Sequence, residues 1–181
     1  MTIISNNYNF LFIHIPKCGG SSIEIEFERL AKWGDFVVGS TPNGYKLEKI
    51  FSELFNLDKH TPPSKLKKIL GDKWSKYKKV TIVRNPKKII ESYYKFGKRR
   101  EGEICKNRKI TREELLEDIS NEKKFVPRWM FKQTNGVMID AITSENFEQY
   151  LEKVADERWS NFFDEYVFSN ELDHILKLEN P

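Results

Sequence analysis

The sequence predicts a three-layer α/β fold with a central, mostly parallel β-sheet flanked by helices. Residues 10–15 and 79–84 are short apolar runs bounded by breakers, as buried strands usually are. A stretch with apolar residues at helical spacing follows each run, and strands that alternate with helices are typical of a parallel sheet. We therefore expect ligands to bind at the carboxyl ends of these strands.

Length and composition predict one soluble globular domain over residues 1–181. The chain is 39% hydrophobic and 32% charged, with 13 Phe, 7 Tyr and 4 Trp to fill a core, and this composition excludes a disordered chain. Its net charge of +4 is too modest to indicate a nucleic acid partner. Basic residues nevertheless gather at 65–79, 84–100 and 106–112, and this clustering favours a smaller anionic ligand.

The cysteines and the apolar segments predict where the protein works. Two cysteines are too few for a disulfide framework, which favours a reducing compartment. The N-terminus shows no secretory pattern, and no run approaches the ~20 apolar residues of a membrane span. We therefore expect a cytoplasmic protein without a membrane partner. We also expect no metal, because no Cys/His cluster has the spacing of metal ligands.

A glycine-rich turn, residues 17–22, joins the first predicted strand to a helix. Two glycines in KCGGSS permit a sharp bend in which successive N–H groups face one point. The serines that end the turn suit a helix N-cap, and the helix should run to about residue 33. Its expected apolar side consists of Ile23, Ile25, Phe27 and Leu30. Lysine, backbone nest and helix N-terminus together predict a site for a phosphate-like anion.

The lysine of this turn argues against the usual nucleotide loop. The Walker pattern places its lysine after the second glycine, whereas Lys17 precedes the pair Gly19 and Gly20. ATP or GTP is therefore disfavoured as a ligand, and a nucleotide kinase is the third-ranked function.

The second predicted strand ends in another candidate anion site. Arg84 closes the strand, and Pro86 suits the first turn of a helix over residues 87–96. Strand, arginine and helix again bring positive groups to the carboxyl edge of the sheet.

The rest of the chain predicts shorter elements. Further helices are expected at residues 46–57, around Leu66 to Leu70, and at 111–119, 129–133 and 147–154, and further strands at 36–38 and 137–142. Residues 98–109 are highly charged and contain a glycine, which predicts a solvated loop; an acceptor-binding rim using Arg99 and Arg100 is the alternative. His174 is predicted to lie on the surface.

The first turn resembles the 5′-phosphosulfate loop of sulfotransferases, especially the carbohydrate-type family 2. The proline, the lysine, the glycine pair and the two hydroxyl residues all match, and Cys18 stands where threonine is usual. Arg84, Pro86 and Ser92 resemble the same family's 3′-phosphate motif. Ile89 replaces a further arginine there, with Lys88 as a substitute cation.

The resemblance implies a P-loop-like fold and a donor, 3′-phosphoadenosine 5′-phosphosulfate (PAPS), that leaves as the desulfated bisphosphate. The acceptor would be a hydroxyl or amine, expected on a carbohydrate or a small hydroxyl compound. The sequence leaves polysaccharide, small glycoside, lipid and peptide tyrosine all open as acceptors. Since many animal members are membrane-anchored, a chain without an anchor would be microbial or viral. The residues expected to bind the donor are Lys17, Cys18, Gly19, Gly20, Ser21, Ser22, Arg84 and Ser92. The alternative is a non-catalytic protein that binds PAPS or its desulfated product.

Two histidines and a cysteine require separate interpretation. The resemblance implies that His60, in a loop before two prolines, is the catalytic base beside the catalytic Lys17, with Glu24 and Glu91 as weaker candidates. An imidazole suits proton removal at neutral pH. His14 lies inside the first strand and is predicted to be structural. Cys18 at a helix N-terminus should have a lowered thiol pKa, but the favoured interpretation is a small side chain tolerated where threonine is usual.

Overall fold

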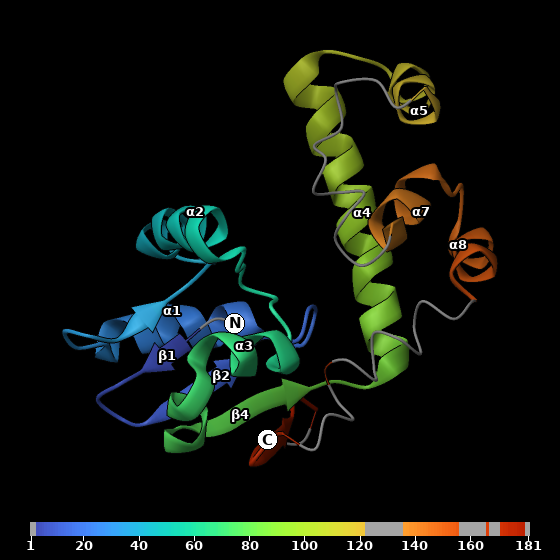
Figure 1. Ribbon diagram of the computed structural model, residues 1–181. Helices are drawn as coiled ribbons and strands as arrows, with labels where there is room; N and C mark the ends of the chain where they lie inside the picture. The colour runs from blue at the N-terminus through green and yellow to red at the C-terminus, as the bar shows by residue number, and fades with distance from the viewer. Residues whose placement is uncertain (1–2, 122–135, 156–165, 167–170, 180–181) are drawn as a thin grey trace. The chain divides into compact units, whose positions relative to one another are not determined.

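A computed structural model describes residues 3–121, 136–155, 166 and 171–179 (Figure 1). Within it the chain forms two compact units, one from Met1–Asn85 with Phe163–Pro181 and the other from Pro86–Phe162. That the chain is one domain stays a prediction.

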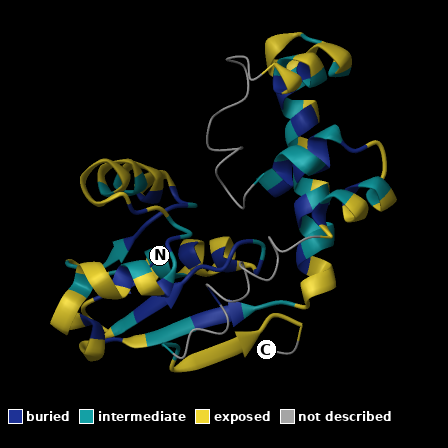
Figure 2. Ribbon diagram, turned by 45° about the vertical axis from the view of Figure 1, so that its right-hand side comes forward, coloured by how far each residue is buried: buried dark blue, intermediate teal, exposed yellow. Residues whose placement is uncertain are grey.

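The first unit contains a mixed sheet with the strand order β3-β1-β2-β4-β5. The strands are β1 (Ile3–Ser5), β2 (Phe10–Ile13), β3 (Phe36–Val37), β4 (Lys78–Val83) and β5 (His174–Lys177). β2, β4 and β5 pair in parallel, whereas β1 pairs antiparallel with both β2 and β3. The two predicted long strands are thus adjacent, and their carboxyl ends lie at the same edge of the sheet. The edge strand β5 is exposed along its length, including His174 (Figure 2).

Strand β1 corrects the expectation of a mostly parallel sheet. The polar residues Asn6 to Asn9 form a tight connection in which Asn9 adopts a left-handed φ of 53°. Asp35 holds this connection through bonds from the Ser5 hydroxyl and from the backbone N–H of Asn7. A short hairpin can join only antiparallel strands, so β1 runs against β2. Three apolar or small residues in a polar stretch gave too little periodicity to predict this strand.

Helices cover both faces of this sheet. They are α1 (Gly20–Leu30), α2 (Pro42–Phe55), α3 (Pro63–Leu70) and the 3₁₀ turn η1 (Gly71–Lys76). On one face Phe27 and Ala31 pack against a core formed by Ile3, Phe12, Val37 and Ile82. On the other face, Ile4 lines a pocket together with Leu66 of α3.

The buried side of α1 differs from the predicted one. Ile23, Ile25 and Leu30 are exposed, whereas the residues buried on this helix are Gly20 and Glu24, with Phe27 half-buried. The inward stripe therefore follows positions 20, 24, 27 and 31, and it contains a carboxylate. The apolar residues alone predicted the wrong buried side, because two of the residues that face inward are a glycine and a glutamate.

The second unit is helical in its described part. It contains α4 (Pro86–Arg108), α5 (Arg112–Ser120), α7 (Val137–Thr143) and α8 (Phe147–Val154). Its core consists of Ile104, Leu115, Ile119, Met138 and Ile142. At Gly97, an added Cβ would lie 2.5 Å from the Cβ of Ala141, so this glycine permits the close packing of α4 on α7.

Two predictions in this unit are wrong. Residues 98–108 are not a loop but the second half of α4, because their charges pair within the unit, and only Lys109 lies in a turn. Glu101 binds Lys98 at 2.9 Å and Arg112 at 2.7 Å, and the Lys98 amine donates to the carbonyl of Ser144 at the C-terminal end of α7. Residues 137–142 are helical rather than extended. The predicted helix at 129–133 lies outside the described residues.

Candidate functional site

The glycine-rich turn connects β2 to the N-terminus of α1. Lys17 and Gly19 both adopt left-handed backbone conformations, with φ of 64° and 82°, and α1 begins at Gly20. The first N–H groups of a helix have no acceptor within it, so they face the turn with their partial positive charge. Ser21 and Ser22 are exposed in this first helical turn. The geometry can therefore bind an anion.

Gly20 is required by the close approach of His14. A Cβ at this position would lie 2.4 to 2.6 Å from three atoms of the His14 ring, which is buried and cannot move aside easily. We expect Gly20→Ala to lower the free energy of unfolding by about 1–3 kcal/mol in urea denaturation. The matched control is Gly102→Ala, since a Cβ at Gly102 would meet nothing within 4 Å. The free energy of unfolding of this variant should rise by up to ~1 kcal/mol, because alanine favours a helix more than glycine does. Equal stability of wild type and Gly20→Ala would contradict the close approach.

The second anion-binding candidate, Arg84, lies against this turn. Its Nη1 donates to the backbone carbonyl of Lys17 at 3.3 Å. This contact follows from the sheet, because Arg84 comes just after β4 and Lys17 just after the adjacent parallel strand β2. The Arg84 Nε also lies 3.5 Å from Oε1 of Glu179, and both carboxylate oxygens of Glu179 accept from the backbone N–H of Asn85 at 3.2 Å.

The expectation of a lowered thiol pKa for Cys18 is wrong. The side chain is only 1% exposed, and this burial raises its pKa to about 12. A backbone hydrogen bond from Arg84 and that residue's positive charge oppose the rise but do not cancel it. Loss of water therefore outweighs the field of the helix N-terminus and the nearby cations.

We expect Cys18→Thr to keep the turnover of the protein within about threefold of the wild type, since the thiol is protonated at neutral pH and cannot act as a nucleophile. A threonine hydroxyl can accept the backbone N–H of Arg84 that now contacts the sulfur. Steady-state kinetics of both proteins checks this expectation, and loss of most turnover in the variant would assign the sulfur a chemical role.

His60 lies in the loop between α2 and α3, and its ring is near the end of β2. Its Nδ1 is 3.1 Å from the backbone carbonyl of His14, and the Tyr166 hydroxyl donates to the backbone carbonyl of His60. The ring is half-buried. Loss of water, followed by the effects of His14 and Lys59, lowers the pKa of His60 well below its ordinary value. His60 is consequently neutral at pH 7, as a general base must be.

His14 is buried, as predicted, and it has a charged partner. Its Nδ1 lies 2.6 Å from Oε1 of Glu24, and both side chains are almost completely buried. Burial lowers the pKa of His14, and the hydrogen bond to Glu24 only partly offsets this effect. The rings of His14 and His60 contact edge to face, with centroids 4.6 Å apart.

Ser92 belongs to the second unit, where it is half-buried on α4. Ile89 on the same helix is 1% exposed, so the position that resembles an arginine site holds a buried apolar side chain. Lys88 pairs with Glu91 at 3.1 Å on the exposed surface. That Ser92 and Arg84 bind the same phosphate stays a prediction.

Three residues that contact the candidate site residues have no signal in the sequence. The Ser40 hydroxyl donates to Ser21 at 2.8 Å, Tyr166 binds the loop of His60, and Glu179 contacts Arg84. All three come from segments without a recognisable motif. Glu24, by contrast, could have been recognised as buried, because it shares a helical stripe with Gly20 and Phe27.

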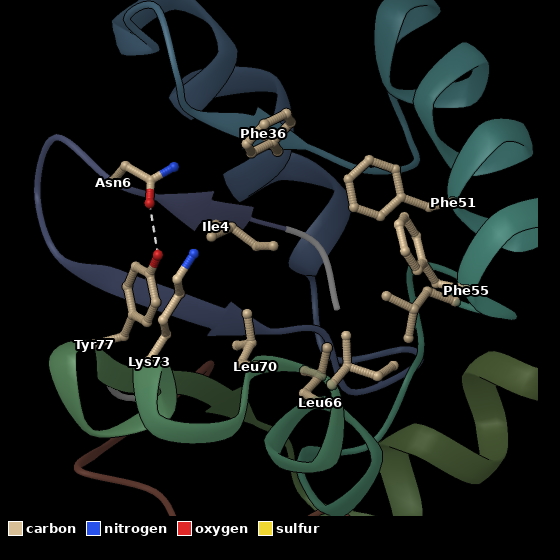
Figure 3. A pocket seen from close by; sticks show the side chains of 11 residues that line it. Ile4, Asn6, Phe36, Phe51, Phe55, Leu66, Leu70, Lys73 and Tyr77 are labelled. Atoms are coloured by element: carbon tan, nitrogen blue, oxygen red, sulfur yellow. Dashed lines mark hydrogen bonds between the residues drawn. The ribbon is translucent and has the colours of Figure 1, made fainter.

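An apolar hollow of about 290 Å³ lies elsewhere in the first unit (Figure 3). Aromatic and aliphatic side chains from α2 and α3, such as Phe51, Phe55 and Leu66, surround it with Ile4 of β1. The Tyr77 hydroxyl donates to Asn6 at 2.6 Å at one end. None of the described lining residues belongs to the glycine-rich turn, so this hollow is separate from the candidate anion site.

Neither a metal-ligand group nor a membrane-spanning helix occurs among the described residues. No group of three or more His, Cys, Asp or Glu side chains within them could hold a metal ion. No helix in the described part of the chain is long and apolar enough to cross a membrane.

Comparison with known proteins adds one finding. The model of a family described as "Sulfotransferase family" matches residues 1–167. No curated protein and no solved structure matches the chain.

Proposed function

The chain belongs to the sulfotransferase family, and we propose that it transfers a sulfuryl group from PAPS to a hydroxyl or amine of an acceptor, expected to be a carbohydrate. The observation that supports this most is the contact between Arg84 and the Lys17 carbonyl at 3.3 Å. It brings the two candidate anion-binding segments together at one edge of the sheet, where a single ligand with two phosphate-like groups could reach both.

The residues of the turn fit the 5′ end of such a donor. The N–H groups of Gly19, Gly20 and Ser21 would bind the sulfate and phosphate oxygens. The Ser22 N–H donates to the Gly19 carbonyl at 3.1 Å, so Ser22 would contribute its exposed hydroxyl instead. Arg84 would bind the 3′-phosphate, with Ser92 as its proposed second ligand. Selection of PAPS over ATP would follow, because ATP has no 3′-phosphate.

The chain's own part in the reaction is to position groups and stabilise charge. When bound, PAPS would supply the sulfuryl group, which would pass in line from the donor's bridging oxygen to the oxygen or nitrogen of the acceptor. Lys17 would neutralise the negative charge that grows on the departing oxygen. His60, neutral at pH 7 with Nδ1 directed at a backbone carbonyl, would accept the acceptor's proton on Nε2.

The direct test is transfer of ³⁵S from labelled PAPS to a panel of glycans, small phenols and amines, with and without a metal chelator. We expect transfer to at least one acceptor class and equal rates in chelator, since sulfate carries less charge than a terminal phosphate and a lysine can suffice. Binding of the desulfated donor without transfer to any acceptor would favour the non-catalytic alternative. A strict Mg²⁺ requirement with ATP as donor would indicate a kinase.

Glu179 should compete with the donor for Arg84. Because its carboxylate lies 3.5 Å from the guanidinium, Glu179→Gln is expected to tighten binding of adenosine 3′,5′-bisphosphate by about fivefold or less, the range of an exposed ion pair. Isothermal titration calorimetry measures this change. Glu26→Gln is the matched control, since Glu26 pairs with Arg29 on the outer surface of α1 and should leave binding unchanged. Weaker binding by Glu179→Gln would contradict the competition.

A further inference from the structure

The inward stripe of α1 carries a carboxylate where a core-facing helix normally has an apolar side chain. Glu24 is 0% exposed and lies one helical turn below the glycine of the anion turn. Burying a carboxylate is unfavourable unless hydrogen bonds compensate, and an apolar residue would stabilise the fold at least as well. Packing alone therefore does not explain Glu24, and its contacts indicate another role.

Glu24 fixes the side chain of His14. An ionised carboxylate accepts hydrogen bonds but donates none, so with Glu24 ionised the proton of the 2.6 Å contact belongs to Nδ1 of His14. The opposite side of the ring lies against Gly20, where there is no room even for a Cβ. The ring of His14 thus has one orientation and one neutral tautomer.

His14 in turn fixes His60 in two ways. Its backbone carbonyl accepts from Nδ1 of His60 at 3.1 Å, which leaves the lone pair of His60 on Nε2. Its ring packs against the His60 ring at 69°, with centroids 4.6 Å apart, and this contact opposes rotation of the imidazole. The Tyr166 hydroxyl holds the backbone carbonyl of His60 as well.

We propose that Glu24 and His14 are positioning residues that hold His60 in the tautomer and orientation in which its Nε2 can accept a proton. The catalytic consequence rests on the proposed role of His60 as base. The placement of the His60 ring does not rest on it. The two parts can therefore be tested separately.

The placement is tested by ¹⁵N NMR of the imidazole nitrogens, which needs no turnover. The chain has three histidines, and His174→Gln, in the exposed strand β5, simplifies their assignment. At pH 7.5 we expect protonated Nδ1 and unprotonated Nε2 for both His14 and His60, and a mixture of tautomers for His14 in Glu24→Gln. A proton on Nε2 of His60 in the wild type would overturn the proposal.

The consequence is tested by kinetics of two variants. His14→Asn retains a donor near the position of Nδ1 but removes the ring that His60 contacts, and Glu24→Gln removes the fixed acceptor. Both should lower kcat by about tenfold to a hundredfold, with unchanged binding of adenosine 3′,5′-bisphosphate. Glu26→Gln, on the exposed face of α1, is the control and should behave as the wild type.

The outcomes distinguish this inference from the proposed function. If Glu24 and His14 only stabilised the fold, their substitution would lower the melting temperature but leave kcat of the folded enzyme intact. That result would overturn the positioning role. Full activity of His60→Ala would instead remove the proposed base. In that case the NMR result alone would decide whether Glu24 and His14 place the ring.

Discussion

Lys17→Met is expected to lower kcat for sulfuryl transfer by about a thousandfold, the upper range for removing one preorganised group that stabilises charge in a transition state. Methionine has nearly the length of lysine without its charge. It also has the same difficulty in adopting the left-handed φ of 64° at this position, so backbone strain is matched. Single-turnover kinetics with saturating donor isolates the chemical step.

The control for Lys17→Met is Lys17→Gly. Glycine adopts the left-handed backbone conformation without strain, but it also lacks the charge. Both variants should be equally inactive while still folded, because the charge and not the backbone is at issue. A Lys17→Met enzyme with more than a tenth of wild-type kcat would show that the departing oxygen is neutralised by another group.

His60→Ala is expected to lower kcat by about a hundredfold to ten-thousandfold, as for loss of a general base. The wild type provides a second signature. Because burial, His14 and Lys59 lower the pKa of His60, the base stays neutral below the ordinary imidazole pKa of 6.5. Activity should thus be constant from pH 7.5 down through 6.5 and fall only at lower pH, when the imidazole becomes protonated.

The control for this pH profile is the stability of the fold. The pKa values of both His14 and His60 are lowered, so the unfolded chain binds protons more readily than the native one below about pH 6.5, and stability is lost as pH falls. Circular dichroism at each pH separates unfolding from titration of the base. An acid limb at or above pH 6.5 in a fully folded enzyme would contradict the assignment of His60.

The main features of the site could be predicted because they depend on short, local patterns. Strand β2, the turn at residues 17–22 and helix α1 follow one another as expected, and the run at 79–84 forms the neighbouring strand with Arg84 at its end. Parallel pairing of β2 and β4 then brings both turns to one edge. That adjacency follows from chain topology, which is why two separated motifs were sufficient to suggest it.

Features that depend on distant partners could not be predicted. The sequence of residues 98–109 is typical of a loop, and only the structure shows that Glu101 pairs with both Lys98 and Arg112. Likewise, the position of Cys18 in the sequence predicts an activated thiol, and only the structure shows that the thiol is buried. The pairing of Glu24 with His14 joins a helix to a strand and has no signature in spacing alone. In each case tertiary packing outweighed a local tendency.

The central claim is that the glycine-rich turn and Arg84 bind opposite ends of one adenosine donor. The most direct measurement is the Kd of adenosine 3′,5′-bisphosphate and of adenosine 5′-monophosphate, by calorimetry, for the wild type and Arg84→Ala. We expect Arg84→Ala to weaken binding of the bisphosphate by about a hundredfold, as when a charged partner of a phosphate is removed, and to leave binding of the monophosphate unchanged. Equal weakening of the binding of both ligands, or no binding of the bisphosphate by the wild type, would contradict the proposal that the turn and Arg84 bind one donor.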